Sequence, residues 1–221
     1  MEDLENAIKD LQRNKSRDAL EQANELFKEE VAGDDFKLAI LKLMNMIKTR
    51  LQYPEGLEQC NITSIYKNKG SRKEFNSYRG VFRVTVLRSI LDRLTYNDSY
   101  YTIDDNLSDG NVGARKERNI RDNIFVIGAI SNSVLNGKQP PIHITITDVE
   151  KCFDKLWLEA AINSLYEAGL KNDMLNLLYL ENKTANIAVK VNGKLSKRVK
   201  VHKVVMQGSV WGGTQVHHYY G

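Results

Sequence analysis

The stretch Ile144–Trp157, ITITDVEKCFDKLW, decides the fold, because an alternating β-branched run in it ends on an aspartate. Residues 142–147 are therefore expected to form a short buried strand, and a helical pattern follows it. A strand that ends in a turn into a helix is how α/β proteins hold a rigid carboxylate. Asp148 is thus a candidate metal ligand or acid/base group, with the alternative that it caps the following helix.

The remaining chain alternates helical and strand patterns, which predicts an α+β protein. Helices are expected at residues 4–12, from a cap at Asp18 through Val31, and at 36–51, 84–94, 122–135, 157–168 and 171–182. A short strand is expected at Ile62–Tyr66. Asn192-Gly193 stands between two β-type runs and predicts a hairpin. The C-terminal WGGTQVHHYYG carries two glycines and no helical stripe, so no helix is expected there.

Positive charge gathers in two zones, although the net charge of the whole chain is only +4. Residues 61–93 hold eight Lys or Arg against Glu74 and Asp92, and residues 184–203 hold six and no acid. Such zones on a nearly neutral chain indicate a polyanion partner, although two solvated surfaces would give the same pattern.

The composition excludes several classes of protein. A hydrophobic content of 42% supports a packed core, and no run approaches the roughly 20 apolar residues of a membrane span. The N-terminus is too polar for a secretory signal, so we expect an intracellular protein, nuclear or cytoplasmic, with no membrane association. Cys60 and Cys152 lack C-x-x-C spacing and are interpreted as reduced thiols.

Two further segments suit a nucleotide. SIYKNKGSRKEFNSYRGV (64–81) places cations in a glycine-containing turn that suits a triphosphate, although no Walker loop is present. Those cations are Lys67, Lys69, Arg72, Lys73 and Arg79. In VVMQGSVWGG (204–213), Gln207 and Gly208 combine an orienting amide with a close backbone approach.

In this order the segments resemble the reverse transcriptases of non-long-terminal-repeat (non-LTR) retrotransposons. YKNKGSRKEFNSYRG resembles the fingers block K-K-G-x-x-x-x-x-x-N-Y-R-P, with Gly80 where proline is usual. NVGARKERNIRDNIFV resembles G-F-R-x-G-R-S-x-x-D-x-I. ITDVEKCFDKLW resembles the palm block D-L-x-K-A-F-D-x-V, and VVMQGSVWGG resembles V-x-Q-G-x-x-x-S-P. Residues 4–28 are similar to the extension that precedes the fingers.

The resemblance implies a right-hand polymerase fold with packed helices and an antiparallel sheet. Its parts would be a helical N-terminal extension (1–56), fingers (57–141) and an incomplete palm (142–221). It also implies an RNA template, a DNA primer and deoxynucleoside triphosphates as partners.

The resemblance further implies a role for each matched residue. Asp148 and the Val149 carbonyl would bind Mg²⁺, of which the intact family uses two ions. Arg79, with Lys67 or Lys69, would hold the triphosphate. Phe153 would disfavour a 2′-hydroxyl on the incoming nucleotide, and Gln207 and Gly208 would line its pocket.

The family's second carboxylate motif, Y-x-D-D, has no counterpart in this sequence. The Asp-Asp pairs are 34–35 and 104–105, both before Asp148. One carboxylate does not assemble a two-metal site, so we expect a truncated polymerase fragment with little or no activity. The alternatives are a non-catalytic nucleic-acid-binding module and a relic without function.

Overall fold

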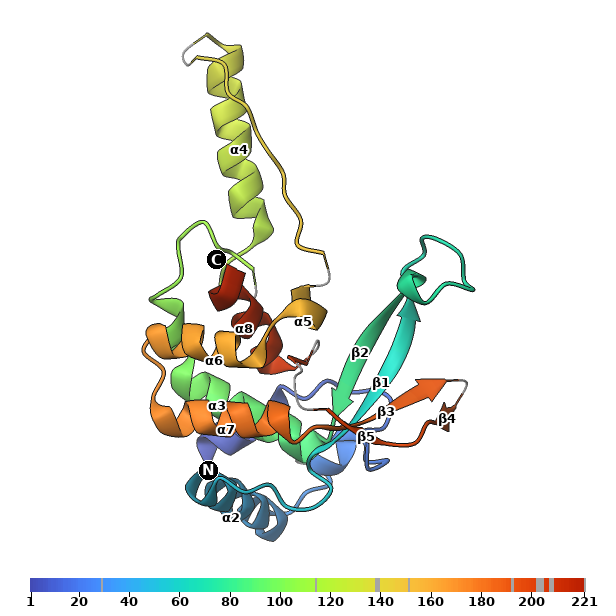
Figure 1. Ribbon diagram of the computed structural model, residues 1–221. Helices are drawn as coiled ribbons and strands as arrows, with labels where there is room; N and C mark the ends of the chain where they lie inside the picture. Colours follow the sequence, from blue (N-terminus) through green and yellow to red (C-terminus); the bar gives the residue numbers. More distant parts are fainter. Residues whose placement is uncertain are drawn as a thin grey trace.

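The computed structural model describes residues 1–28, 30–113, 115–137, 140–150, 152–191, 193–201, 205–206 and 209–220. Helices form a body beside one small sheet, and a long helix with an extended segment beside it projects from that body (Figure 1). The expected α+β class is confirmed.

The elements follow one another along the chain without an internal repeat. The helices are α1 (Glu2–Lys9), α2 (Asp34–Arg50), α3 (Val86–Asp104), α4 (Ile120–Leu135), α5 (Cys152–Lys155), α6 (Leu158–Glu167), α7 (Asn172–Lys183) and α8 (Val210–Tyr220), with the 3₁₀ turns η1 (Asn24–Phe27) and η2 (Phe75–Ser77). The strands are β1 (Gln59–Tyr66), β2 (Tyr78–Val84), β3 (Asn186–Val191), β4 (Lys194–Leu195) and β5 (Val199–Lys200).

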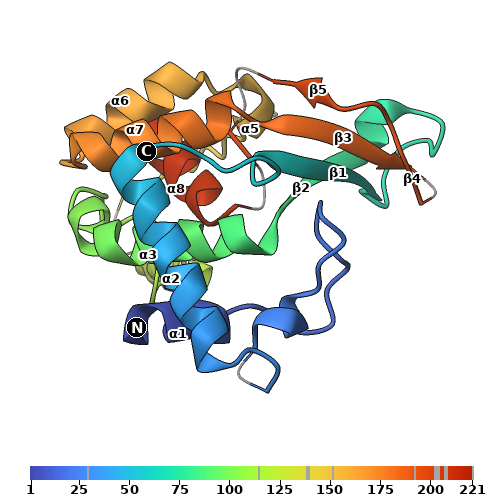
Figure 2. The same cartoon turned by 90° about the horizontal axis from the view of Figure 1, so that it is seen from below.

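Helix α3 is the centre of the body, and helices α1, α2, α6, α7 and α8 pack around it (Figure 2). Its N-terminal half contributes Ile90 and Leu91 to a cluster with α1 and α2. Its C-terminal half contributes Ile103 to a second cluster with α6, α7 and Trp211 of α8. Burial of these apolar side chains is the main stabilising term for the body.

The sheet has the order β2-β1-β3-β4, with β5 also paired to β3. Strands β1 and β2 are antiparallel, whereas β1 and β3 are parallel. The expectation of an antiparallel sheet was therefore wrong in part, because the chain crosses through the helices between β1 and β3 before it returns. The hairpin at Gly193 is confirmed, since β3 and β4 pair antiparallel across it.

The second N-terminal helix does not form, and η1 is all that remains of it. Asp18 is 1% exposed and accepts hydrogen bonds from the backbone N–H groups of Leu20 and Gln22, both at 2.8 Å. Its other oxygen accepts the N–H of Val86 at 2.7 Å. Hydrogen bonds from a carboxylate to nearby backbone N–H groups compete with the hydrogen bonds of a helix. Asp18 therefore does not begin a helix of its own but accepts the N–H of the first residue of α3.

The strand expected at residues 142–147 is absent. The segment is extended without sheet pairing, and Ile146 is 91% exposed. Strand propensity reflects packing against neighbouring strands, and in the described residues β1 and β3 pair directly with each other.

One helix is longer than the sequence indicated, and one forms where no helix was expected. Helix α3 continues to Asp104, because Tyr100 and Ile103 are buried in its last turns. Helix α8 forms although it contains two glycines, and Trp211 anchors it with an indole N–H bond to the Thr95 hydroxyl at 3.1 Å. At Gly212 a Cβ would meet the Met206 carbonyl oxygen at 2.4 Å, so glycine permits this close approach.

Candidate functional site

The loop between β1 and β2 is braced by its own side chains. The Tyr66 hydroxyl donates to the Gly70 carbonyl at 2.6 Å, and the Tyr78 hydroxyl donates to the Arg72 carbonyl at 2.9 Å. Gly70 has φ +82°, a left-handed conformation that glycine adopts without strain. The loop therefore carries its cations on a defined scaffold.

A cleft of about 710 Å³ lies between this hairpin and the segment around Asp148. Its lining residues are Lys67, Lys69, Asn76, Tyr78, Arg79, Gly80, Asp148, Val149, Glu150, Cys152 and Phe153. Three cations thus face two carboxylates across one space. Residues that the sequence analysis named from segments about 70 positions apart are brought together here.

The cations of this cleft differ in what already engages them. Lys67 Nζ donates to the Asn76 carbonyl at 3.0 Å. The side chains of Lys69 and Arg79 form no ion pair with any described residue. Lys69 and Arg79 are therefore the cations most available to an anionic ligand.

The carboxylate side of the cleft is exposed. Asp148 ends the extended segment, and Glu150 lies 3.6 Å from Lys155 in an ion pair. Phe153 of α5 is half-buried, and it also packs against a small cluster of Leu156, Ala161 and Val205. Phe153 thus lines the cleft and also contributes to the core.

Gln207 and Gly208 lie outside the described residues, so their predicted role has no structural account. Among the residues that the structure describes, no group of three His, Cys, Asp or Glu side chains gathers as a metal site. The oxygen donors at the cleft are the Asp148 and Glu150 carboxylates and the Val149 carbonyl. Hard oxygen ligands of this number are what Mg²⁺ takes when substrate phosphates complete its shell.

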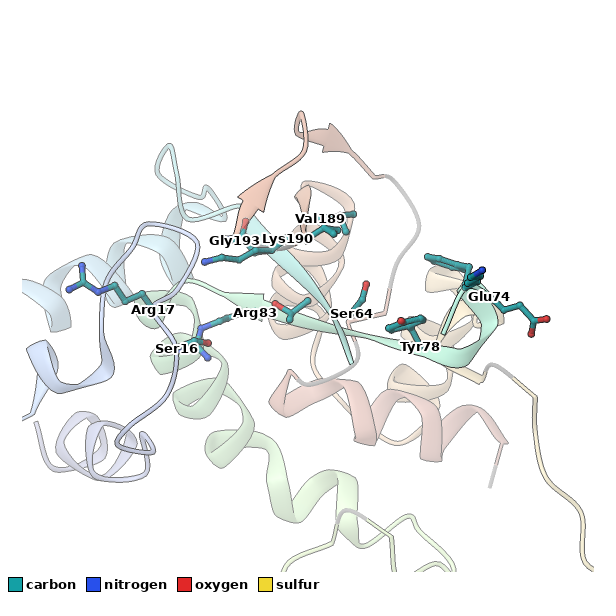
Figure 3. Close-up of a pocket in the computed structure, with 14 residues that line it drawn as sticks. Ser16, Arg17, Ser64, Glu74, Tyr78, Arg83, Val189, Lys190 and Gly193 are labelled. Carbon is teal, nitrogen blue, oxygen red and sulfur yellow. The ribbon is translucent and has the colours of Figure 1, made fainter. Parts of the chain in front are cut away.

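A second cleft, of about 790 Å³, joins the two basic zones of the sequence (Figure 3). The zones share one sheet because β1 pairs with both β2 and β3. The lining cations are Arg17, Lys73, Arg83 and Lys190, from the N-terminal loop, the β1–β2 hairpin and β3. Glu74 points away from Arg83 and Lys190.

Sequence reasoning missed Arg17, because nothing local ties the N-terminal loop to the sheet. Arg83 has a buried Nε without a hydrogen-bond partner, and burial lowers the pKa of its guanidinium. Lys190 lies 3.9 Å from Glu21, a weak and exposed pair. The position of Lys190 in the second basic zone was the signal that could have found this cleft.

Other cations of the basic zones are structural. Arg198 donates to the Cys60 and Asn186 carbonyls at 3.3 and 3.2 Å and therefore ties β1 to β3. Arg88 is 2% exposed inside the helical body. Charge counts along the sequence thus overestimate the positive surface.

Arg88 lies in a buried polar cluster with Asp92, Glu181 and Tyr53. Arg88 is 3.9 Å from Glu181, whose carboxylate also accepts the Tyr53 hydroxyl. Burial, with the nearby Asp92 carboxylate, raises the pKa of Glu181 well above its ordinary value, while Arg88 opposes the shift. Burial likewise raises the pKa of Asp92, against the attraction of Arg88. Both shifts therefore favour the protonated, neutral forms of these two carboxyl groups over their ionised forms.

Both cysteines are free, as expected. Burial raises the pKa of the Cys60 thiol to about 11, which makes it unreactive.

No family model and no curated protein matches the chain. Within the described residues, every helix is too short or too polar to cross a bilayer.

Proposed function

We propose that this chain is a fragment of an RNA-directed DNA polymerase of the non-LTR retroelement type. It would comprise the fingers and part of the palm, and the cleft beside Asp148 would bind a deoxynucleoside triphosphate with Mg²⁺. The observation that carries the proposal is the composition of this cleft, where Lys69 and Arg79 face Asp148, Val149 and Phe153. The same positions match the motifs of that family in the sequence.

The chemistry of each side of the cleft supports binding of such a ligand. A guanidinium forks onto phosphate oxygens, and a lysine adds a compact positive charge, so Arg79 and Lys69 suit a triphosphate. Asp148 and the Val149 carbonyl would hold one Mg²⁺ together with the phosphates. When bound, the ion would offset phosphate charge and orient the triphosphate. Phe153 would pack against the sugar.

We expect binding without turnover from this chain. A two-metal transfer needs more carboxylates than Asp148 and its neighbour Glu150 supply, and the sequence holds no Asp-Asp pair after residue 148. Absence of template-directed incorporation is therefore part of the proposal.

Equilibrium titration of the full chain with a fluorescent deoxynucleoside triphosphate and Mg²⁺ tests the proposal. Arg79→Gln is expected to weaken binding about tenfold or more, since it removes a charge-assisted contact of about 1.5–3 kcal/mol. Arg50→Gln is the matched control, because Arg50 is an exposed arginine on α2 outside the cleft. Equal affinities of the two variants would overturn the assignment.

A second candidate function is a non-catalytic nucleic-acid-binding module. It is favoured by the pairing of both basic zones in one sheet, with the cleft of Arg17, Lys73, Arg83 and Lys190 at their junction. Four cations on one concave surface suit a phosphate backbone, and Tyr78 and the exposed Phe75 supply rings for base stacking.

The salt dependence of binding to a short single-stranded oligonucleotide tests this second function. Each phosphate contact removed is expected to lower the slope of log K against log salt by about 0.7. The double variant Arg83→Gln/Lys190→Gln should therefore have a slope lower by about 1.4 than the wild type and Arg50→Gln. Binding that does not respond to salt or to the double variant would exclude the module.

A further inference from the structure

Neither of the two clefts is lined by the arm, defined here as α4 with the extended residues 140–147. It projects from the helical body, and the extended segment lies alongside α4 (Figure 1). No residue of α4 is buried. Ten large apolar side chains of the arm are 42–91% exposed: Ile120, Ile124, Phe125, Val126, Ile127, Ile130, Leu135, Ile142, Ile144 and Ile146.

This exposure lies at the upper end of what a monomer usually carries. At about 100 Å² of apolar surface for each large side chain, the arm leaves on the order of 600 Å² uncovered. That is the upper end of the largest apolar patch on a typical monomer, roughly 300–600 Å². It also approaches the roughly 800 Å² that each partner buries in a stable interface.

The apolar residues of α4 do not form one stripe. Ile124, Phe125, Val126 and Ile127 are consecutive and all are exposed, so they point to different sides of the helix. A helix that is apolar around its circumference is normally buried on more than one side. The extended segment runs beside α4 in Figure 1, yet no residue of α4 is buried.

The extended segment has the sequence of a strand and lacks the features that protect an edge. Residues 142–147 read IHITIT, with five β-branched residues and no charge. Solvent-exposed strands usually carry lysine, proline or a bulge that blocks pairing with another chain. The prolines 140 and 141 precede these six residues and leave their N–H groups able to pair.

The charge pattern indicates which partner fits. From Asn123 to Thr147 the sequence contains one charged residue, Lys138. An uncharged surface offers nothing to a basic or acidic partner, but it meets its own copy without repulsion. Each copy supplies both an apolar helix and an unpaired extended segment, and a two-fold axis lets identical surfaces complement each other.

We propose that two copies of this chain associate through their arms around a two-fold axis. The α4 helices pack against each other, and residues 142–147 of the copies pair as antiparallel strands. Because the arm projects from the body, the two bodies lie apart in such a dimer, and Asp148 at the base of each arm stays with its own cleft. This inference is independent of what the clefts bind.

Sedimentation equilibrium of the full chain tests the proposal. Wild type is expected to sediment at twice the chain mass at micromolar concentration. Phe125→Glu is expected to sediment as a monomer, since it places a charge in the arm. Tyr166→Glu is the matched control, because Tyr166 is 61% and Phe125 76% exposed, and Tyr166 of α6 lies outside the arm and both clefts. Both positions are exposed, so neither change disturbs the body.

Thr145→Pro and Thr145→Ser separate strand pairing from helix packing. Proline removes an N–H and blocks pairing, so it should weaken the dimer at least tenfold, whereas serine should leave it unchanged. A monomeric wild type would overturn the proposal, and so would a dimer that survives Phe125→Glu. A monomer whose 142–147 amides are protected from hydrogen exchange would show that the arm folds onto its own body, and it would also overturn it.

Discussion

Helices α3 and α4 have similar lengths, yet ten residues of α3 are buried and none of α4. Helix α4 is the more apolar of the two, since it carries two charged residues, Arg121 and Asp122, both in its first turn. Helix α3 carries charges and aromatic rings, and it is surrounded by helices that come before and after it in the chain. Apolar composition therefore specifies that a helix has surface to bury, whereas the rest of the chain decides whether a partner is present.

The sharpest test of this comparison truncates one isoleucine in each helix. Ile90→Ala in α3 removes a fully buried side chain and should lower the free energy of unfolding by about 2–5 kcal/mol. Ile124→Ala in α4 removes a side chain that is 61% exposed and should change it by less than about 0.5 kcal/mol. Urea unfolding in dilute samples measures both. Equal losses would mean that the arm packs on the body.

The next largest expected effect on stability comes from replacing two glycines, one in the packed body and one in the exposed helix α4. Gly212→Ala should destabilise the body by about 1–3 kcal/mol, because its Cβ would overlap the Met206 carbonyl. Gly128→Ala has nothing within 4 Å of the new Cβ, so it should stabilise α4 by about 1 kcal/mol through helix propensity. Thermal unfolding measures the first change, and hydrogen exchange of the α4 amides measures the second. A destabilised α4 would contradict the view that it is solvated.

The buried carboxyl pair in the body predicts a pH effect that the arm lacks. The pKa of Glu181 is raised in the folded chain, so above the unfolded value of 4.5 the folded state holds a proton that the unfolded state releases. Stability should therefore fall as the pH rises from 4.5 towards the raised value, by up to about 1.4 kcal/mol per pH unit.

Glu181→Gln should flatten this pH dependence, because a neutral amide replaces the group that takes up the proton. Glu159→Gln on the exposed side of α6 is the control and should leave the slope unchanged. Urea unfolding at a series of pH values measures both. A wild type whose stability increases through this range would contradict a raised pKa of Glu181.

Local patterns predicted the parts of the fold that local forces determine. Residues 36–51, 122–135 and 171–182 form helices as expected, and Gly193 lies in the hairpin that Asn192-Gly193 predicted. Distant contacts decided the rest. Asp18 caps α3 across 68 positions of sequence, and its own expected helix is lost as a result. The segment 142–147 has strand propensity without a strand beside it.

The candidate site also has a part that the sequence predicted and a part that depends on distant contacts. Motif order pointed to Lys67, Lys69, Arg79, Asp148, Val149 and Phe153, and one cleft contains them all. Their roles towards a nucleotide stay predictions. Of the second cleft only Lys190 had a sequence signal, its place in the second basic zone, whereas Arg17 lines the cleft through a tertiary arrangement that leaves no local pattern.

The effect of Mg²⁺ on triphosphate affinity tests the central claim, that Asp148 and the hairpin cations form one nucleotide site. Mg²⁺ should strengthen binding by the wild type and by Asp35→Asn, an exposed aspartate on α2 outside the cleft. Asp148→Asn should lose that gain and bind the Mg²⁺-free triphosphate at least as tightly, since a negative charge near the phosphates is removed. An undiminished Mg²⁺ gain in Asp148→Asn would contradict the claim.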